Sequence, residues 1–172
     1  MDERLGTLFK GAAGQCAVLS EFLYRLMNVA VPEVDIGDDI FVVTEKDETV
    51  TRVQAKHAKA EAQANGSWVA QFMLPWEQFF HDDTPPLVYV LAVRFNDQWN
   101  DFIVVRRSVL VEMHRRNPIG SNATDTSGTA TGVKLRLVFT EGDVKCQGKQ
   151  SLQVFRGAFT PWPPPEAVQE TR

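Results

Sequence analysis

Apolar residues recur at helical spacing near the N-terminus. Over residues 3–28 they follow three- and four-residue steps: Leu5, Leu8, Phe9, Ala12, Cys16, Leu19, Leu23, Leu26 and Met27. This period predicts an amphipathic helix. Gly11 and Gly14 lower its intrinsic propensity, but they allow a neighbouring element to approach closely. Pro32 ends any helical continuation.

Four apolar runs further along the chain are typical of strands. IFVV at 40–43 and TVTRVQAKHA at 49–58 flank the polar turn TEKDE, which favours an antiparallel hairpin. LVYVLAVRF at 87–95 and WNDFIVVRR at 99–107 are joined by a tight connection, NDQ, and form a second pair. Pro75 suits the first turn of a short helix. Residues 108–116 predict another helix, with Ser108 as its cap.

The last third of the chain is more polar. Residues 117–132, NPIGSNATDTSGTATG, predict a flexible loop or boundary after a core at 1–116. VKLRLVFT and SLQVFRGAF predict two more strands within 133–172, followed by a Pro-rich tail. This last part belongs to the same domain or forms a β-rich appendage. The order predicts an α/β fold, a mixed sheet with the N-terminal helix on one face and the 108–116 helix on the other.

Composition narrows the class of protein. The chain has 172 residues, 44% hydrophobic and 23% charged, as expected for an ordinary globular protein. It lacks an apolar run near the ~20 residues of a membrane span and a signal-peptide pattern, so we expect a cytoplasmic protein without a membrane partner. Cys16 and Cys146 show no metal-type spacing and are expected to be reduced thiols. The net charge of −4 argues against an extensive basic surface but allows a local patch.

The segment RVQAKHA at 52–58 carries the candidate chemistry. Gln54 and Lys56 lie on the same side of the expected strand, and Asp39 stands at the mouth of the strand before it. A short hairpin would bring the three to one end of the sheet. A carboxylate can hold Mg²⁺, which polarises a phosphate and lowers the pKa of bound water. A lysine ammonium can stabilise the charge that develops on the phosphate. Phosphodiester hydrolysis is the chemistry that needs this group.

The same segments resemble the PD-(D/E)XK nuclease superfamily, which includes Holliday-junction resolvases, many restriction endonucleases and Mrr-like enzymes. The resemblance rests on FKGAAGQCAVLSEFLYRL in the first helix, on VDIGDDIFVV and on VQAK, and covers residues 8–107. It implies a restriction-endonuclease-like core and cleavage of DNA that depends on Mg²⁺ or Mn²⁺. Many members act as dimers, so we also expect a homodimer, formed through the apolar strand pair or the tail.

The resemblance also implies roles for single residues. Asp39 matches the metal-binding Asp, and Gln54 and Lys56 match the (E/Q)xK motif, with Gln54 as auxiliary ligand or water positioner. Where relatives often carry Glu in the first helix, this chain has Gln15, and Glu21 follows six residues later. Either Gln15 or Glu21 would complete the metal shell. With amides at 15 and 54, Asp39 is the one carboxylate expected close by.

Two other interpretations stay open. One is a catalytically inactive nuclease-like fold that serves as a nucleic-acid or protein binding module. The other is an α/β protein outside the superfamily, in which Asp39 and Lys56 are not neighbours. Asp35 and Asp38 are expected to be turn residues around Gly37 rather than ligands. The arginines at 106, 107, 115 and 116 form a basic cluster that contacts phosphates if they share one face, or else are ordinary helix charges.

Overall fold

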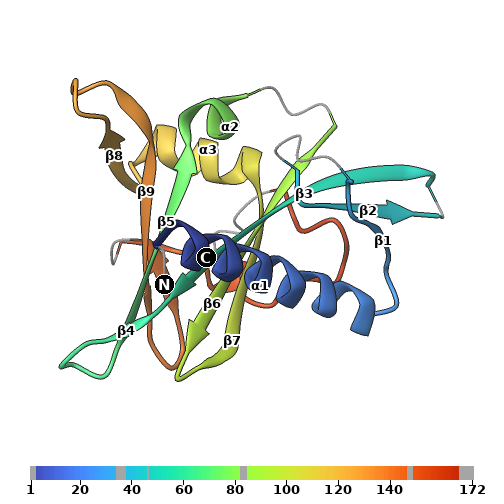
Figure 1. Ribbon diagram of the computed structural model, residues 1–172, viewed down its shortest axis with the longest axis horizontal. Helices are drawn as coiled ribbons and strands as arrows, with labels where there is room; N and C mark the ends of the chain where they lie inside the picture. Colours follow the sequence, from blue (N-terminus) through green and yellow to red (C-terminus); the bar gives the residue numbers. More distant parts are fainter. Residues whose placement is uncertain (1–2, 34–37, 46, 82–84, 147–148, 167–172) are drawn as a thin grey trace.

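Two β-sheets and three α-helices make up the described part of the protein. The structure is a computed structural model that describes residues 3–33, 38–45, 47–81, 85–146 and 149–166 (Figure 1). The helices are α1 (Glu3–Tyr24), α2 (Trp76–Phe80) and α3 (Arg107–Arg116), with a 3₁₀ turn at Gln153–Phe155. None of the helices in these ranges is both long and apolar enough to cross a bilayer.

The first sheet has the order β1-β2-β3-β6-β7. Its strands are β1 (Asn28–Ala30), β2 (Ile40–Thr44), β3 (Thr49–Lys59), β6 (Leu87–Phe95) and β7 (Gln98–Arg106). β3 and β6 run parallel, whereas the β1–β2, β2–β3 and β6–β7 pairs are antiparallel. The sheet is therefore mixed, as the sequence predicts.

The second sheet is antiparallel and has the order β11-β10-β9-β5-β4, with β8 also paired to β9. Its strands are β4 (Glu61–Ala62), β5 (Trp68–Pro75), β8 (Gly120–Thr124), β9 (Ala130–Phe139), β10 (Val144–Cys146) and β11 (Gln150–Ser151). β4, β5 and α2 lie in the chain between β3 and β6 and form the crossover that two parallel strands require.

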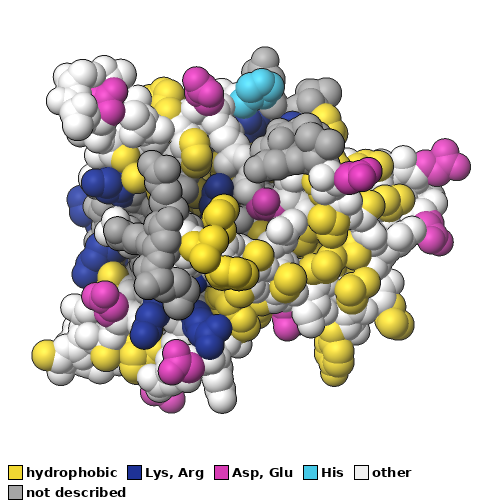
Figure 2. Space-filling model, viewed as in Figure 1, with side chains coloured by type: hydrophobic (Ala, Val, Ile, Leu, Met, Phe, Trp, Pro, Cys, Tyr) yellow, Lys and Arg dark blue, Asp and Glu magenta, His cyan; other side chains and the backbone are white. Residues whose placement is uncertain are grey.

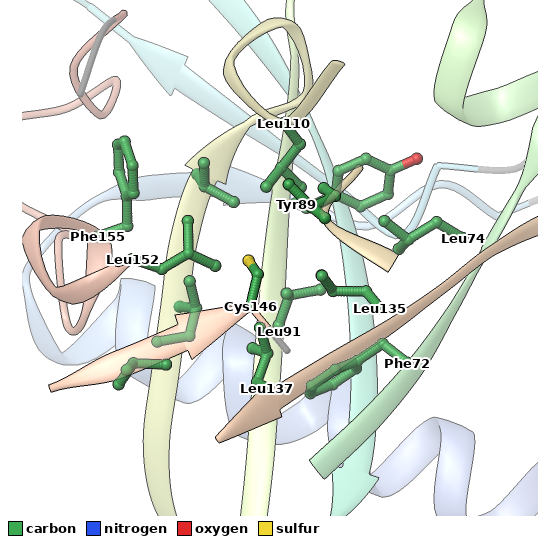
Figure 3. Close-up of a cluster of buried hydrophobic side chains, with 14 of the residues drawn as sticks. Phe72, Leu74, Tyr89, Leu91, Leu110, Leu135, Leu137, Cys146, Leu152 and Phe155 are labelled. Carbon is green, nitrogen blue, oxygen red and sulfur yellow. The ribbon is translucent and has the colours of Figure 1, made fainter. Parts of the chain in front are cut away.

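β6 is the centre of the packing because both of its faces are buried. Leu87, Tyr89, Leu91 and Val93 belong to the larger hydrophobic cluster, which the second sheet, α2 and α3 complete (Figure 3). Val88, Val90 and Ala92 belong to a second cluster, which includes Val18 and Phe22 of α1. A near-continuous apolar strand of this kind is typical of a strand covered on both sides. α1 and α3 thus lie on opposite faces of the first sheet, and this prediction is confirmed.

α1 differs from the expected amphipathic helix in the direction of its apolar side chains. The buried residues of the helix include Val18 and Phe22, at 0% exposure. Most of the large apolar residues that predicted the helix point outward instead, and Leu8 and Phe9 keep 70% and 66% of their surface exposed. The helix therefore has a second apolar face that the described part of the chain leaves uncovered.

Gly14 allows α1 to lie close to β3. A Cβ atom at this position would lie 2.6 Å from Cβ of His57, closer than real Cβ contacts come, whereas a Cβ at Gly11 would meet nothing within 4 Å. The sequence prediction that a glycine permits close approach is confirmed for Gly14.

Several expectations for the chain after β3 are wrong. Residues 117–132 are not a loop throughout, because they contain β8, and SLQVFRGAF forms the short β11 and the 3₁₀ turn rather than one strand. Ser108 does not cap α3, whose N-cap is Arg106, without a side-chain capping bond. β5 and β10 were missed. β9 pairs with β5 from Val133 to Phe139 and joins the same hydrophobic cluster, so these C-terminal strands pack on the core. The domain boundaries at 116 and 132 stay a prediction.

Candidate functional site

An open cleft forms where β2 leaves the edge of β3. Ile40 pairs with Val53, and the backbone N–H of Asp39 donates to the Val53 carbonyl at 3.0 Å. Beyond this point β3 pairs only with β6 among the described strands, so its other edge faces a cleft of about 610 Å³. Residues of α1, β3, β5 and α2 line the cleft together with Asp39: Thr7, Gly11, Gln15, Gln54, Ala55, Lys56, His57, Phe72, Met73, Pro75, Glu77 and Gln78.

The Asp39 carboxylate forms hydrogen bonds with β3 at the start of this strand edge. Its Oδ2 accepts the backbone N–H of Ala55 at 2.8 Å and also accepts a hydrogen bond from Nε2 of Gln54. Gln15 of α1 donates from its Nε2 to the Asp39 backbone carbonyl at 2.8 Å. The carboxylate is thus held at the cleft by two elements, β3 directly and α1 through the backbone.

Gln54 links Asp39 to the protein interior. Only 5% of its surface is exposed, and its Oε1 accepts a hydrogen bond from Nε2 of Gln78. The Tyr89 hydroxyl donates to Oε1 of Gln78 at 3.4 Å, and Nη1 of Arg107 donates to the Gln78 backbone carbonyl at 3.2 Å. A polar network therefore runs from the core to the cleft, and such networks orient their members strongly.

Sequence reasoning missed both cleft residues that α2 contributes. Gln78 and Glu77 both come from α2, a five-residue helix that carries no motif. Pro75 predicted the helix, but no local signal indicated that it packs beside β3. Glu77 matters most because it adds a second carboxylate to the cleft that holds Asp39 and Lys56.

Glu21 does not join this cleft, which corrects the expectation that it would be a metal ligand. Its Oε2 lies 2.6 Å from Nη1 of Arg25, and the Arg25 guanidinium lies 4.5 Å from the centre of the Phe159 ring. Six residues are one and two-thirds helical turns, so Glu21 and Gln15 project from different sides of α1.

Other charged candidates have structural partners. Nε of Arg52 lies 3.0 and 2.8 Å from the two carboxylate oxygens of the buried Asp38, so Asp38 is an ion-pair residue. Asp35 lies outside the described residues. The four arginines do not form one basic face. Arg107 is buried, Nε of Arg106 donates to the Pro164 carbonyl at 2.6 Å, and Arg116 is exposed.

The cleft offers oxygen ligands to a hard cation. No group of three or more His, Cys, Asp or Glu side chains gathers around a metal position within the described ranges. The available oxygens are the Asp39 and Glu77 carboxylates and the amide oxygens of Gln15 and Gln54, the last of which would have to leave Gln78. Mg²⁺ commonly binds one or two carboxylates and completes its shell with waters and substrate phosphates. The donor set therefore fits Mg²⁺ or Mn²⁺.

His57 lies on the α1 side of β3 against Gly14. Partial burial lowers the pKa of its imidazole, and the positive charges of Lys10 and Lys56 lower this pKa further. Both lysines thus raise the electrostatic potential at His57, which lines the cleft.

The lowered pKa predicts a pH-dependent stability. Because His57 takes up a proton less readily in the folded state than in the unfolded chain, the free energy of unfolding should fall as pH drops below about 6.5. His57→Gln should make this fall shallower. Denaturant unfolding at about pH 7.5 and about pH 5.5, within the histidine range, measures it. His114, whose pKa burial also lowers, remains in both proteins as the internal control. An identical pH dependence in the variant would contradict the prediction.

A comparison with solved structures relates the fold to a nuclease. The chain matches a bacterial homing endonuclease, I-Ssp6803I, with a TM-score of 0.50 and 18% sequence identity over 88% of each chain. At 18% identity the similarity shows the fold alone, and the fold is therefore nuclease-like. No family model matches the sequence. No curated protein matches it either.

Proposed function

We propose that this protein is a DNA endonuclease of the PD-(D/E)XK type that hydrolyses phosphodiester bonds with the help of Mg²⁺ or Mn²⁺. The observation that carries the proposal is the convergence of Asp39, Gln54 and Lys56 in one cleft of a nuclease-like fold. Three residues of these types at an open strand edge have the chemistry that phosphodiester cleavage needs.

A bound divalent cation would polarise the scissile phosphate and lower the pKa of a water beside it. Asp39 would hold the cation, with Glu77 of α2 as a second carboxylate in the cleft. Gln54 keeps the Asp39 carboxylate in one orientation, because it donates to Oδ2 while Gln78 holds its other end. Gln15 holds the backbone of Asp39, because its Nε2 donates to the Asp39 carbonyl.

Lys56 supplies positive charge in the cleft. It lies two residues after Gln54, so both side chains leave the same face of β3. An ammonium group here would stabilise the negative charge that grows on the phosphate oxygens as the water attacks. Stabilisation of developing charge by a fixed group is commonly the largest contribution to such catalysis.

DNA as the substrate is supported by the charge around the cleft. A neighbouring groove is lined by the basic residues Lys10, Lys59 and Arg94, by Asp97, which pairs with Arg94, and by His57, which belongs to both hollows. Because the whole chain carries a net charge of −4, these basic side chains are concentrated locally and do not reflect a basic surface overall. Lysine and arginine contacts to phosphates position a protein on DNA and provide most of the sequence-independent affinity.

Calorimetric titration with Mg²⁺ and Mn²⁺ tests the proposal. We expect the natural protein to bind the cation weakly alone and more tightly with a short DNA duplex, since phosphate oxygens complete the shell. Asp39→Ala should abolish both bindings. A Glu112→Ala variant, which removes an exposed carboxylate of α3, is the matched control and should bind like the natural protein. Cation binding unchanged in Asp39→Ala would overturn the assignment of the site.

A second function has one observation in its favour. The amides of Gln15 and Gln54 occupy the places where relatives often carry Glu, and both are engaged in hydrogen bonds. This arrangement is compatible with a nuclease-like fold that binds nucleic acid or protein without cleaving it. DNA binding without any cation binding in the same titration would favour this function over catalysis.

A further inference from the structure

The outer face of α1 carries an apolar seam that the described residues leave uncovered. Its members follow alternating four- and three-residue steps along the helix: Leu5, Phe9, Ala12, Cys16, Leu19 and Leu23. All are exposed except Leu19, which is half-buried. Figure 2 shows hydrophobic side chains over a broad area of this face, along α1. Such spacing, sustained over the length of the helix, is the a/d pattern of a coiled coil.

The seam is separate from the face that α1 turns to the sheet. Gly14, Val18 and Phe22 contact the sheet side and are buried. At 100° per residue the seam lies roughly a third of a turn or more from this face. Leu19 also packs against the cluster on this side of the sheet, whereas Leu5, Phe9 and Leu23 stay exposed, as does Leu8 beside the seam, at 70%. A helix that is apolar on more than one side belongs to a larger buried assembly.

The size of the uncovered surface matches an interface. Leu5, Leu8, Phe9, Leu23 and Leu26 are exposed by 47%, 70%, 66%, 53% and 94%. At roughly 200 Å² for a large apolar side chain, they present on the order of 600 Å² per protomer, about half from Leu5, Phe9 and Leu23 of the seam and about half from Leu8 and Leu26 beside it. Monomeric proteins rarely expose a contiguous apolar patch beyond a few hundred Å². Standard interfaces bury about 800 Å² per partner, which these residues and their neighbours approach.

We propose that a second copy of this chain covers the seam, so that two α1 helices pack against each other in a homodimer. The occupant follows from the pattern, because an a/d seam fits another helix with the same seam, and a two-fold interface joins identical patches. The seam contains no charged residue that pairing would leave buried. The side chains of Leu87 to Val93 of β6, one strand of the pair expected from sequence as the interface, are buried within the protomer.

Sedimentation velocity over a wide range of protein concentration tests the dimer without DNA or metal. We expect a dimer for the natural protein and a monomer for Phe9→Glu. This substitution would place one negative charge from each protomer, two per dimer, in the seam. Tyr24→Glu is the matched control: Tyr24 is an aromatic residue of the same helix, 85% exposed and outside the seam, so this variant should remain a dimer. The monomer mass at every concentration, or equal behaviour of the two variants, would overturn the proposal.

Thiol labelling gives an independent readout. Cys16 is exposed at the middle of the seam, whereas Cys146 is buried and burial raises the pKa of its thiol to about 12. Cys146 is thus protected from labelling in the folded protein. The Cys16 thiol should react with a disulfide reagent more slowly as protein concentration rises, and Phe9→Glu should remove this protection. Concentration-independent labelling of the natural protein would count against the dimer. Because neither readout involves cleavage, failure here leaves the proposed nuclease activity untouched.

Discussion

Lys56→Ala is expected to slow metal-dependent cleavage of duplex DNA by about two to three orders of magnitude, the usual loss when one charge-stabilising group is removed. Lys56 lies in the cleft with Asp39, and the ammonium would act on the phosphate while charge develops there. Single-turnover cleavage with enzyme in excess measures the effect, since it isolates the chemical step from product release.

The control for this experiment is Lys149→Ala, which removes an exposed lysine that does not line the cleft. It should cleave at the natural rate. Lys56→Ala should still bind the cation and retain its thermal midpoint, because Asp39 and the core are unchanged. Undiminished cleavage by Lys56→Ala would refute the catalytic assignment of this lysine.

Gly14→Ala is expected to lower the free energy of unfolding by about 1–3 kcal/mol, as overpacking typically does. The added Cβ would lie 2.6 Å from Cβ of His57, an atom held to the backbone of β3, so α1 must move away. This movement should also lengthen the hydrogen bond from Gln15 to the Asp39 carbonyl, and so weaken cation binding. Denaturant unfolding and the calorimetric titration measure the two effects.

Gly11→Ala is the matched control, because it makes the same change three residues earlier on the same helix. Its Cβ would meet nothing within 4 Å, so higher helix propensity should raise stability by about 0.5–1 kcal/mol. Opposite signs for the two substitutions would verify the close approach at Gly14. Stabilisation by both would contradict it.

The local part of the candidate site could be predicted from the sequence. Asp39 and Gln54 are joined by a hairpin, so the short connection and the alternation of side chains on β3 were enough to expect them together with Lys56. The contacts that complete the site were not predictable. Glu77 and Gln78 reach the cleft only because the crossover after β3 returns to it, and Glu21 stays outside because α1 turns the side with Gln15 toward Asp39.

The sequence by itself determined the elements whose signals are local: α1, the two hairpins, the short helix after Pro75 and the apolar β6. The tertiary structure decided everything that depends on partners far apart in the chain. β5 was recognisable only through its pairing with β9, some sixty residues later, and β8 only through the same strand. The period of α1 predicted a helix, but a period does not tell which of two apolar stripes faces the sheet. Packing decided this, since only the stripe with Gly14 can lie against His57.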